Sequence, residues 1–379
     1  MTLNVLSNCK LVLHDEVVNG SLVIEDGLIK QIDQGDVHSA HEDLDGDYLI
    51  PGLVELHTDH LEGHFHPRPG VDWPAVSAVI AHDAQIAASG ITTVFDALRA
   101  GAFDPEDLSA HEGENLARAI TAAQDAGHLR AEHFIHIRCE LPCIDTAEAT
   151  ERICAALAPT LISIMDHTPG ARQFTSLDKF RQYYLGKKLI LPEKIEAYIA
   201  ERLEMQGKYA VHNKKAIVKL ARSLGVRLAS HDDATVAHVE EALEDKVVIA
   251  EFPTTAESAR AAHEGGLAVL MGAPNVVRRG SHSGNISAAA VAGSGHLDIL
   301  SSDYVPTSLL NAAFNLPRQV SSLTLPQALR TVTLNPAKAA GLNDRGSLRA
   351  GLRADLVQVH VANGLPVVKR VWTHGRRVM

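Results

Sequence analysis

The residues with the clearest chemical potential follow a short apolar segment at residues 53–56. This segment is expected to be a strand, and it is followed by His57 and, two positions later, by Asp59. Side chains at positions i and i+2 of a strand project from the same face, so this imidazole and this carboxylate would converge. A nitrogen and an oxygen ligand at one point suit a divalent metal ion. We therefore expect a metal site here, although an isolated His near a strand end is often only hydrogen-bonded.

Four further potential ligands stand just beyond later apolar segments. Each of them alone also has an ordinary role, such as an ion pair with a neighbouring Arg or a cap at the start of a helix. Their shared position after predicted strands favours a metal centre instead. We expect two divalent ions, and Zn, Mn and Fe are all compatible with such ligands. The expected ligands are His57, Asp59, Glu140, His167, His231 and Asp303.

The chemistry expected of such a centre is hydrolysis. A divalent ion lowers the pKa of water and so provides a nucleophile near neutral pH. Glu140 could bridge two ions, and Asp303 could accept the proton of the attacking water and return it to the leaving group. We expect Asp303 and His231 to be the catalytic residues.

A polar loop rich in Arg, Ser and Gly covers residues 271–285. Guanidinium groups bind phosphate oxygens, and glycines let backbone amides approach them, so the loop suits a polyanion. The alternative is an ordinary flexible loop with solvated arginines. Two more arginines follow predicted strand ends that carry ligands. The expected substrate-binding residues are Arg68, Arg172, Arg278, Arg279, Ser281, His282, Ser283 and Asn285.

Eight apolar runs alternate with helical stretches and must position these residues. This pattern is typical of a (β/α)8 barrel, whose active site lies at the carboxyl ends of the strands. A doubly wound sheet is the alternative, but no glycine-rich dinucleotide-binding turn follows the first run. Residues 168–225 are long for one connection and predict a helical lid or insertion. The runs are residues 53–56, 91–95, 134–137, 161–165, 226–229, 247–250, 267–271 and 299–301.

Both ends of the chain contain short strand-like segments separated by turns. Two such ends flanking a long α/β middle suggest one small domain assembled from both termini. We therefore expect an α/β TIM-like barrel over residues 53–344 and a small β-sandwich domain formed by residues 1–52 and 345–379.

The composition excludes several classes of function. Of 379 residues, 46% are hydrophobic and 21% are charged, as in a soluble globular protein. The net charge of −11 disfavours binding to nucleic acid or to an anionic membrane. Four cysteines, no recognisable signal peptide and no membrane-spanning apolar stretch predict a cytoplasmic protein. A homodimer is expected only because such dimers are the commonest oligomers.

Several motifs together resemble a known enzyme family. Ser-His-Asp-Asp at 230–233 and Gly-Ser-His-Ser-Gly-Asn at 280–285 are the most specific. With Pro-Gly-Leu-Val-Glu-Leu-His-Thr-Asp at 51–59 and Met-Asp-His-Thr-Pro-Gly at 165–170, they resemble the amidohydrolase superfamily, in particular its phosphonate-metabolism branch. The resemblance covers nearly the whole chain.

The resemblance implies a barrel, a β-sandwich built from both termini and a metal centre. It also implies hydrolysis of a ribose methylphosphonate triphosphate between its α and β phosphates, in the carbon–phosphorus lyase pathway. The expected partner is then a phosphorylated sugar phosphonate. The pattern departs from the superfamily in two ways. The superfamily usually has His-x-His on the first strand, and Glu140, His167 and His231 here fall one strand early.

Other functions stay open at this point. The first is hydrolysis of an amide or cyclic imide, for which the Arg-rich loop would be unnecessary. The others are a non-catalytic assembly protein, which should lack some of the ligands, and a hydrolase of a different triphosphate. His60, His64 and His66 also make the segment after the first strand unusually rich in histidine, with no assigned role.

Overall fold

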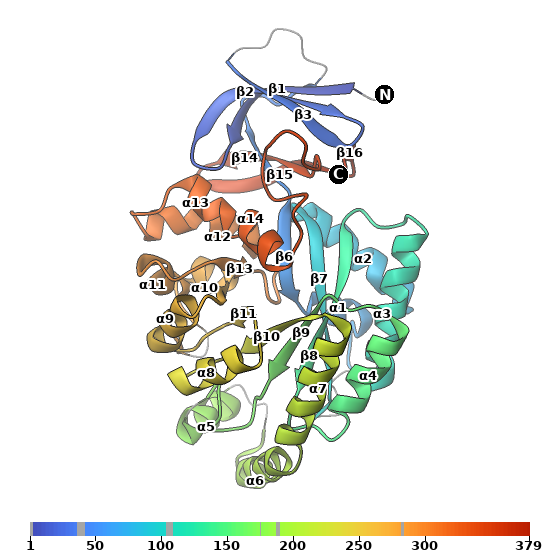
Figure 1. Ribbon diagram of the computed structural model, residues 1–379, viewed down its shortest axis with the longest axis vertical. Coiled ribbons are helices and arrows are strands. Elements are labelled where there is room, and N and C mark those ends of the chain that lie inside the picture. The colour runs from blue at the N-terminus through green and yellow to red at the C-terminus, as the bar shows by residue number, and fades with distance from the viewer. Residues whose placement is uncertain (1–2, 36–41, 104–108, 175, 187–189, 282–283) are drawn as a thin grey trace.

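The computed structural model describes residues 3–35, 42–103, 109–174, 176–186, 190–281 and 284–379. They form a barrel of parallel strands surrounded by helices, and a separate β-sheet that lies above the barrel in Figure 1. In this described part of the chain, no helix is both long and apolar enough to cross a membrane.

The barrel consists of eight parallel strands in their sequence order. This arrangement confirms the predicted TIM-like barrel and all eight predicted strand positions. The strand count therefore holds: Glu140 ends the third strand, His167 follows the fourth, and His231 ends the fifth. The strands are β6 (Leu53–Thr58), β7 (Ile91–Ala100), β8 (Glu132–Glu140), β9 (Leu161–Met165), β10 (Arg227–His231), β11 (Ile249–Glu251), β12 (Ala268–Gly272) and β13 (Ile299–Ser301).

The barrel is nearly closed, and its first and last strands are bridged by a segment from further along the chain. Val54 N donates to Val332 O at 2.9 Å, and Leu300 N donates to Thr331 O at 2.9 Å. The buried carboxylate of Glu55 accepts hydrogen bonds from the end of β13. These contacts hold the carboxyl ends of β6 and β13 together, which brings His57 and Asp303 to one place.

The interior of the barrel divides into an apolar layer and a polar layer. Apolar residues from the strands fill the amino-terminal part as a packed core, as in other barrels of this size. This cluster includes Val54, Leu56, Phe95, Leu161, Ala229, Ile249, Leu270 and Ile299. Toward the carboxyl ends the inward side chains become polar, and these residues form the site described below.

Helices cover the outside of the barrel (Figure 1). Thr235 and Thr255 cap two of them, and both caps come shortly after a strand end. Each cap satisfies a free backbone N–H and so fixes where the chain turns from strand to helix. The helices are α1 (His60–Phe65), α2 (Ala75–Ala88), α3 (Ala110–Asp125), α4 (Thr146–Ala156), α7 (Val211–Leu224), α8 (Val236–Glu244), α9 (Ala256–Glu264), α10 (Ala273–Arg278), α11 (Ala288–Gly293), α12 (Ser308–Gln319), α13 (Leu325–Arg330) and α14 (Leu334–Ala339).

Two additional helices precede α7 in the long connection between β9 and β10. They are α5 (Leu177–Gly186) and α6 (Ile195–Met205), followed by the π-helical turn Gln206–Ala210. They lie at the end of the barrel away from the separate sheet (Figure 1). A small aromatic and aliphatic core of their own holds them together.

Both termini contribute to the separate sheet, which is largely antiparallel and has its own apolar core. Strand β5 leads directly into the barrel, and β14 pairs with it from the other end of the chain. We propose the predicted division into two domains, with the barrel starting at residue 53. The strands are β1 (Leu3–Val12), β2 (Val17–Glu25), β3 (Leu28–Gln34), β4 (Glu42–Asp43), β5 (Tyr48–Pro51), β14 (Leu356–Ala362), β15 (Leu365–Thr373) and β16 (Arg376–Arg377).

Candidate active site

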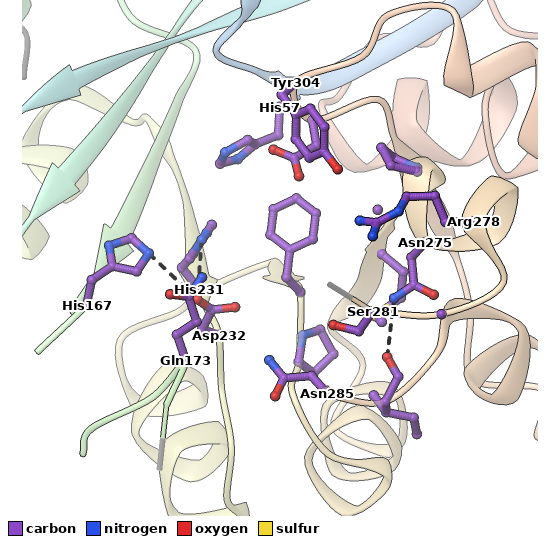
Figure 2. A pocket seen from close by; sticks show the side chains of 18 of the residues that line it. His57, His167, Gln173, His231, Asp232, Asn275, Arg278, Ser281, Asn285 and Tyr304 are labelled. Atoms are coloured by element: carbon purple, nitrogen blue, oxygen red, sulfur yellow. Dashed lines mark hydrogen bonds and ion pairs between the residues drawn. The ribbon is translucent and has the colours of Figure 1, made fainter. Parts of the chain in front are cut away.

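A cavity of about 590 Å³ opens at the carboxyl end of the barrel. Four of the six predicted ligands line it: His57, His167, His231 and Asp303. Figure 2 shows His167, His231 and Asp232 on one side of this space, with Arg278, Asn275 and Ser281 on the other. The cavity therefore joins a group of potential metal ligands to the loop predicted to bind an anion.

Glu251 lies at the centre of the polar layer, at the end of β11. Its Oε1 is 3.0 Å from His57 Nδ1, and its Oε2 is 3.1 Å from His231 Nδ1. Burial would raise the pKa of Glu251, but His57 and His231 hold this pKa well below its usual range. The carboxylate is thus ionised inside the barrel, where a positive charge must accompany it.

Two further residues extend this network on the neighbouring strands. Ser163 Oγ lies 2.7 Å from Glu251 Oε2 and 2.5 Å from His136 Nε2. Burial lowers the pKa of His136 to about 3, so this imidazole is neutral. His57, His136 and Glu251 thus place three potential ligand atoms around one point.

A second set of ligand atoms belongs to His167, His231 and Asp232. Burial lowers the pKa of His231 to about 3, whereas it raises the pKa of Asp232 to about 7. His167 lies between two carboxylates. Its Nε2 is 3.6 Å from Asp232 Oδ2, and its Nδ1 is 2.5 Å from Glu140 Oε2. Glu140 also accepts the backbone N–H of His167. The structure thus places Glu140 behind His167, where it orients the imidazole, outside the lining of the cavity.

The other two predicted ligands are carboxylates beside Arg138. Asp59 Oδ2 lies 2.9 Å from Arg138 Nη1, outside both three-residue ligand groups. Burial, with help from the nearby Asp59 carboxylate, raises the pKa of Asp303 to about 7. A group with this pKa can exchange a proton near neutral pH.

The backbone is strained at three of these strand ends. Asp232 follows His231 with φ 55°, Phe252 follows Glu251 with φ 53°, and Asp303 has φ 54°. For a bulky side chain such as Phe, this left-handed conformation is an outlier. Such strain persists where the surrounding structure imposes it, typically at functional sites. Phe252 lines the cavity beside the rings of His57 and His231.

The predicted substrate-binding residues divide into three groups. Arg278, Ser281 and Asn285 line the cavity, together with Asn275, which was not predicted. In the described residues, Arg68, Arg172 and Arg279 lie outside its lining, and Arg172 forms ion pairs with Asp233 and Glu241. The predicted His282 and Ser283 lie outside the described residues.

A smaller cavity of about 280 Å³ adjoins the first one and shares Arg138, His167 and Gln173 with it. Arg99 and Arg202 also line it, so three guanidinium groups surround this space. Arg202 lies over the rings of Phe103 and Tyr198, at 4.1 and 4.4 Å from their centres. Apart from Phe103, the aromatic residues that line this smaller cavity come from α5 and α6, which therefore shape the site rather than only covering the barrel.

The donor atoms of the central layer fit a divalent metal ion. Burial alone would lower the pKa values of His57 and His167. Both pKa values are raised instead, because the Glu251 carboxylate lies beside His57 and the Glu140 carboxylate lies beside His167. Asp232 Oδ2 is buried and has no hydrogen-bond partner among the described residues, and the buried Glu251 Oε1 has His57 Nδ1 beside it at 3.0 Å. A cation would satisfy both observations, since buried carboxylates either pair with charges or bind metals.

Sequence reasoning missed Glu251 and His136. Glu251 had the same signal as the predicted ligands, because it is the first charged residue after the apolar run at 247–250. His136 carried no such signal, since it lies inside a run that was read as purely apolar.

The sequence is similar to those of known proteins. The model of the amidohydrolase family matches residues 215–378. The chain is 46% identical over 376 residues to alpha-D-ribose 1-methylphosphonate 5-triphosphate diphosphatase of Escherichia coli, covering 99% of this chain and 100% of that protein. It is 23% identical to imidazolonepropionase of Thermoplasma volcanium, covering 96% and 91%.

Solved structures share the fold. N-isopropylammelide isopropylaminohydrolase from Burkholderia multivorans superposes with a TM-score of 0.66 and 18% identity, covering 100% of this chain and 98% of that one. N-acetyl-D-glucosamine-6-phosphate deacetylase from Mycobacterium smegmatis superposes with a TM-score of 0.64 and 18% identity, covering 100% of both chains. By its sequence the chain belongs to the amidohydrolase family, and it is similar over nearly its whole length to the diphosphatase of E. coli.

Proposed function

We propose that this protein hydrolyses α-D-ribose 1-methylphosphonate 5-triphosphate to the 5-phosphate and diphosphate. The observation that carries the proposal is the cavity itself, which places buried imidazole and carboxylate donors opposite Arg278, Asn275 and Ser281. The E. coli relative named for this activity is similar over its whole length. We extend the proposal to the carbon–phosphorus lyase pathway, in which such an enzyme would act.

Two divalent ions are proposed for the two ligand groups. One group consists of His57, His136 and Glu251, and the other of His167, His231 and Asp232. Zn, Mn and Fe all accept such ligands. When bound, such an ion supplies Lewis acidity, which polarises a phosphoryl oxygen and neutralises the charge that develops there. Glu140 fixes the ring of His167 from behind, as carboxylates commonly do for metal-ligating histidines.

Asp303 is proposed as the general base. Its carboxylate faces the same cavity as His57 and His231, and its pKa of about 7 suits proton transfer near neutral pH. It would accept the proton of the attacking water and return it to the leaving diphosphate. Asp59 holds Arg138 at 2.9 Å and, as a neighbouring negative charge, keeps the pKa of Asp303 high.

The substrate is anionic at both ends, and the site carries positive charge on both sides of the donor layer. Arg278 lies on the side of the larger cavity, and Arg99, Arg138 and Arg202 line the smaller one. We propose that the larger cavity takes the sugar phosphonate and the smaller one the diphosphate end. Hydrolysis of an amide would not require cationic groups on both sides.

The proposal is tested by measuring diphosphate release from the ribose methylphosphonate triphosphate. The enzyme is assayed as purified, after removal of metals by a chelator, and after reconstitution with Zn²⁺, Mn²⁺ or Fe²⁺, with ATP as a competing substrate class. We expect metal-dependent release that favours the sugar phosphonate over ATP. Absence of release with every metal, combined with hydrolysis of an amide or cyclic imide, would contradict the proposal.

A further inference from the structure

A second cluster of histidines lies outside the barrel interior, between its wall and the first two helices. His60 and His64 are on α1, and His82 is on α2. Asp96 on β7 and His133 on β8 lie behind them. None of these five residues belongs to the lining of either cavity described above.

The three helical imidazoles form a compact triangle. The ring centres of His60 and His64 are 5.0 Å apart. The ring centre of His82 lies 5.8 Å from that of His60 and 5.9 Å from that of His64. The first two are four residues apart on one helix, which places them on the same face. Three imidazoles that bind one tetrahedral zinc ion, each nitrogen at about 2.1 Å, have ring centres roughly 5 to 6 Å apart. The triangle therefore has the right size for such an ion.

One nitrogen of each imidazole lacks a partner. His60 Nε2, His64 Nε2 and His82 Nδ1 are buried, and none of them has a hydrogen-bond partner within the described parts of the chain. His82 as a whole has no exposed surface. Buried polar atoms are rarely left without a partner, since each such atom costs about 1–3 kcal/mol. Three of them in one small cluster point to a common partner.

The groups behind the triangle prepare His82 for this role. His82 Nε2 lies 2.8 Å from Asp96 Oδ1, and the other oxygen of Asp96 lies 2.7 Å from His133 Nδ1. The carboxylate therefore holds a proton on Nε2 of His82 and leaves the lone pair of Nδ1 directed away from the barrel wall. A carboxylate behind a histidine is the usual support of a metal ligand.

The charge state agrees with this geometry. Burial lowers the pKa of both His64 and His82, and the neighbouring imidazoles add to the effect. Both rings are therefore neutral at pH 7, as metal binding requires. In contrast, although burial opposes it, Asp96 and Asp83 raise the pKa of His133 to about 9, so His133 balances the charge of Asp96.

We propose that His60, His64 and His82 bind a divalent transition-metal ion, with Zn²⁺ as the best match to three imidazole nitrogens, at a site distinct from the barrel centre. The ion would tie α1 to α2 beside the end of β6. The proposed site is independent of the proposed diphosphatase activity, because none of its ligands lines either cavity.

The site is tested by counting metal ions in purified protein. Wild type, His60→Gln, His64→Gln and the control His128→Gln, which alters an exposed histidine outside the cluster, are stripped with a chelator, reconstituted with excess Zn²⁺, desalted and analysed by elemental mass spectrometry. We expect His60→Gln and His64→Gln to retain one equivalent less per chain than wild type and the control. Circular dichroism verifies that all four proteins are folded.

Cobalt substitution provides a second readout that is independent of activity. Tetrahedral Co²⁺ absorbs strongly in the visible range, and part of this absorption should disappear in His60→Gln and His64→Gln but not in His128→Gln. Equal metal content and equal cobalt spectra in all four proteins would overturn the proposed site. Diphosphate release, measured in parallel, reports separately on the barrel centre.

Discussion

Removal of the Arg278 side-chain charge should weaken substrate binding, whereas the same change at Arg279 should not. The two arginines are adjacent in sequence, but only Arg278 lines the cavity. Arg279 follows the last turn of α10 with a left-handed backbone, φ 61°, and is not among the residues that line the cavity. The pair therefore separates a specific contact from the general positive charge of the loop.

The size of the effect follows from the contact that Arg278 can make. A hydrogen bond between a guanidinium group and an anionic oxygen contributes about 1.5–3 kcal/mol. Because about 1.4 kcal/mol corresponds to a factor of ten, Arg278→Gln should raise KM about 10- to 150-fold. Gln keeps most of the side-chain length, so the change removes charge rather than packing. Arg279→Gln should alter KM less than about threefold, as expected for an exposed surface charge.

The assay is the rate of diphosphate release over a range of substrate concentrations for wild type and both variants. Metal content is measured for each, so that a loss of metal is not mistaken for a loss of substrate contact. Equal changes in the two variants, or no change in either, would refute the assignment of Arg278 to the substrate.

Three further predictions follow from other parts of the structure. Glu251→Gln should release barrel metal and lower kcat at least about 100-fold, measured by elemental analysis and diphosphate release, because the central carboxylate is lost; full retention of metal would contradict its role. Asp303→Asn should lower kcat by about 100-fold or more with little change in metal content, whereas near-normal kcat would remove it as the base. Glu132→Gln should destabilise the protein by roughly 2 kcal/mol in urea unfolding, because Arg345 and Arg353, each 5% exposed, lose one of their carboxylate partners and keep Asp344. Burial would raise the pKa of Glu132, but these arginines lower it. The contribution of Glu132 to stability is therefore present above the ordinary Glu pKa and is lost as the pH falls through the lowered value. If the stability of Glu132→Gln depended on acid pH just as that of wild type does, this reasoning would be contradicted.

The barrel could be predicted because its strands are short, buried and apolar, and because they alternate regularly with helices. Each of the eight runs overlaps an observed strand, and the strand count that places Glu140 on the third strand is confirmed. The helical insertion before β10 was visible only as excess length. Nothing in its sequence indicated that its aromatic residues would wall a cavity beside His167.

In the candidate site, only residues at the ends of predicted strands could be predicted from the sequence. His57, His167, His231 and Asp303 follow the rule that polar residues after apolar strands face the carboxyl end of a barrel. Glu251 obeys the same rule but was overlooked, and His136 could not be found because inward and outward positions of β8 were not distinguished. The sequence did not distinguish the arginines that line the cavity from those that do not: Arg278 lines it, whereas the adjacent Arg279, with its left-handed backbone, does not.

The most direct test of the central claim is to identify the products by ³¹P NMR. The holoenzyme is incubated with α-D-ribose 1-methylphosphonate 5-triphosphate, and the spectrum is followed before and after chelation of the metals. Our account predicts the appearance of diphosphate and of the 5-phosphate in equal amounts, with the phosphonate signal retained and no reaction after chelation. Release of orthophosphate instead of diphosphate, or undiminished turnover by metal-free enzyme, would contradict it.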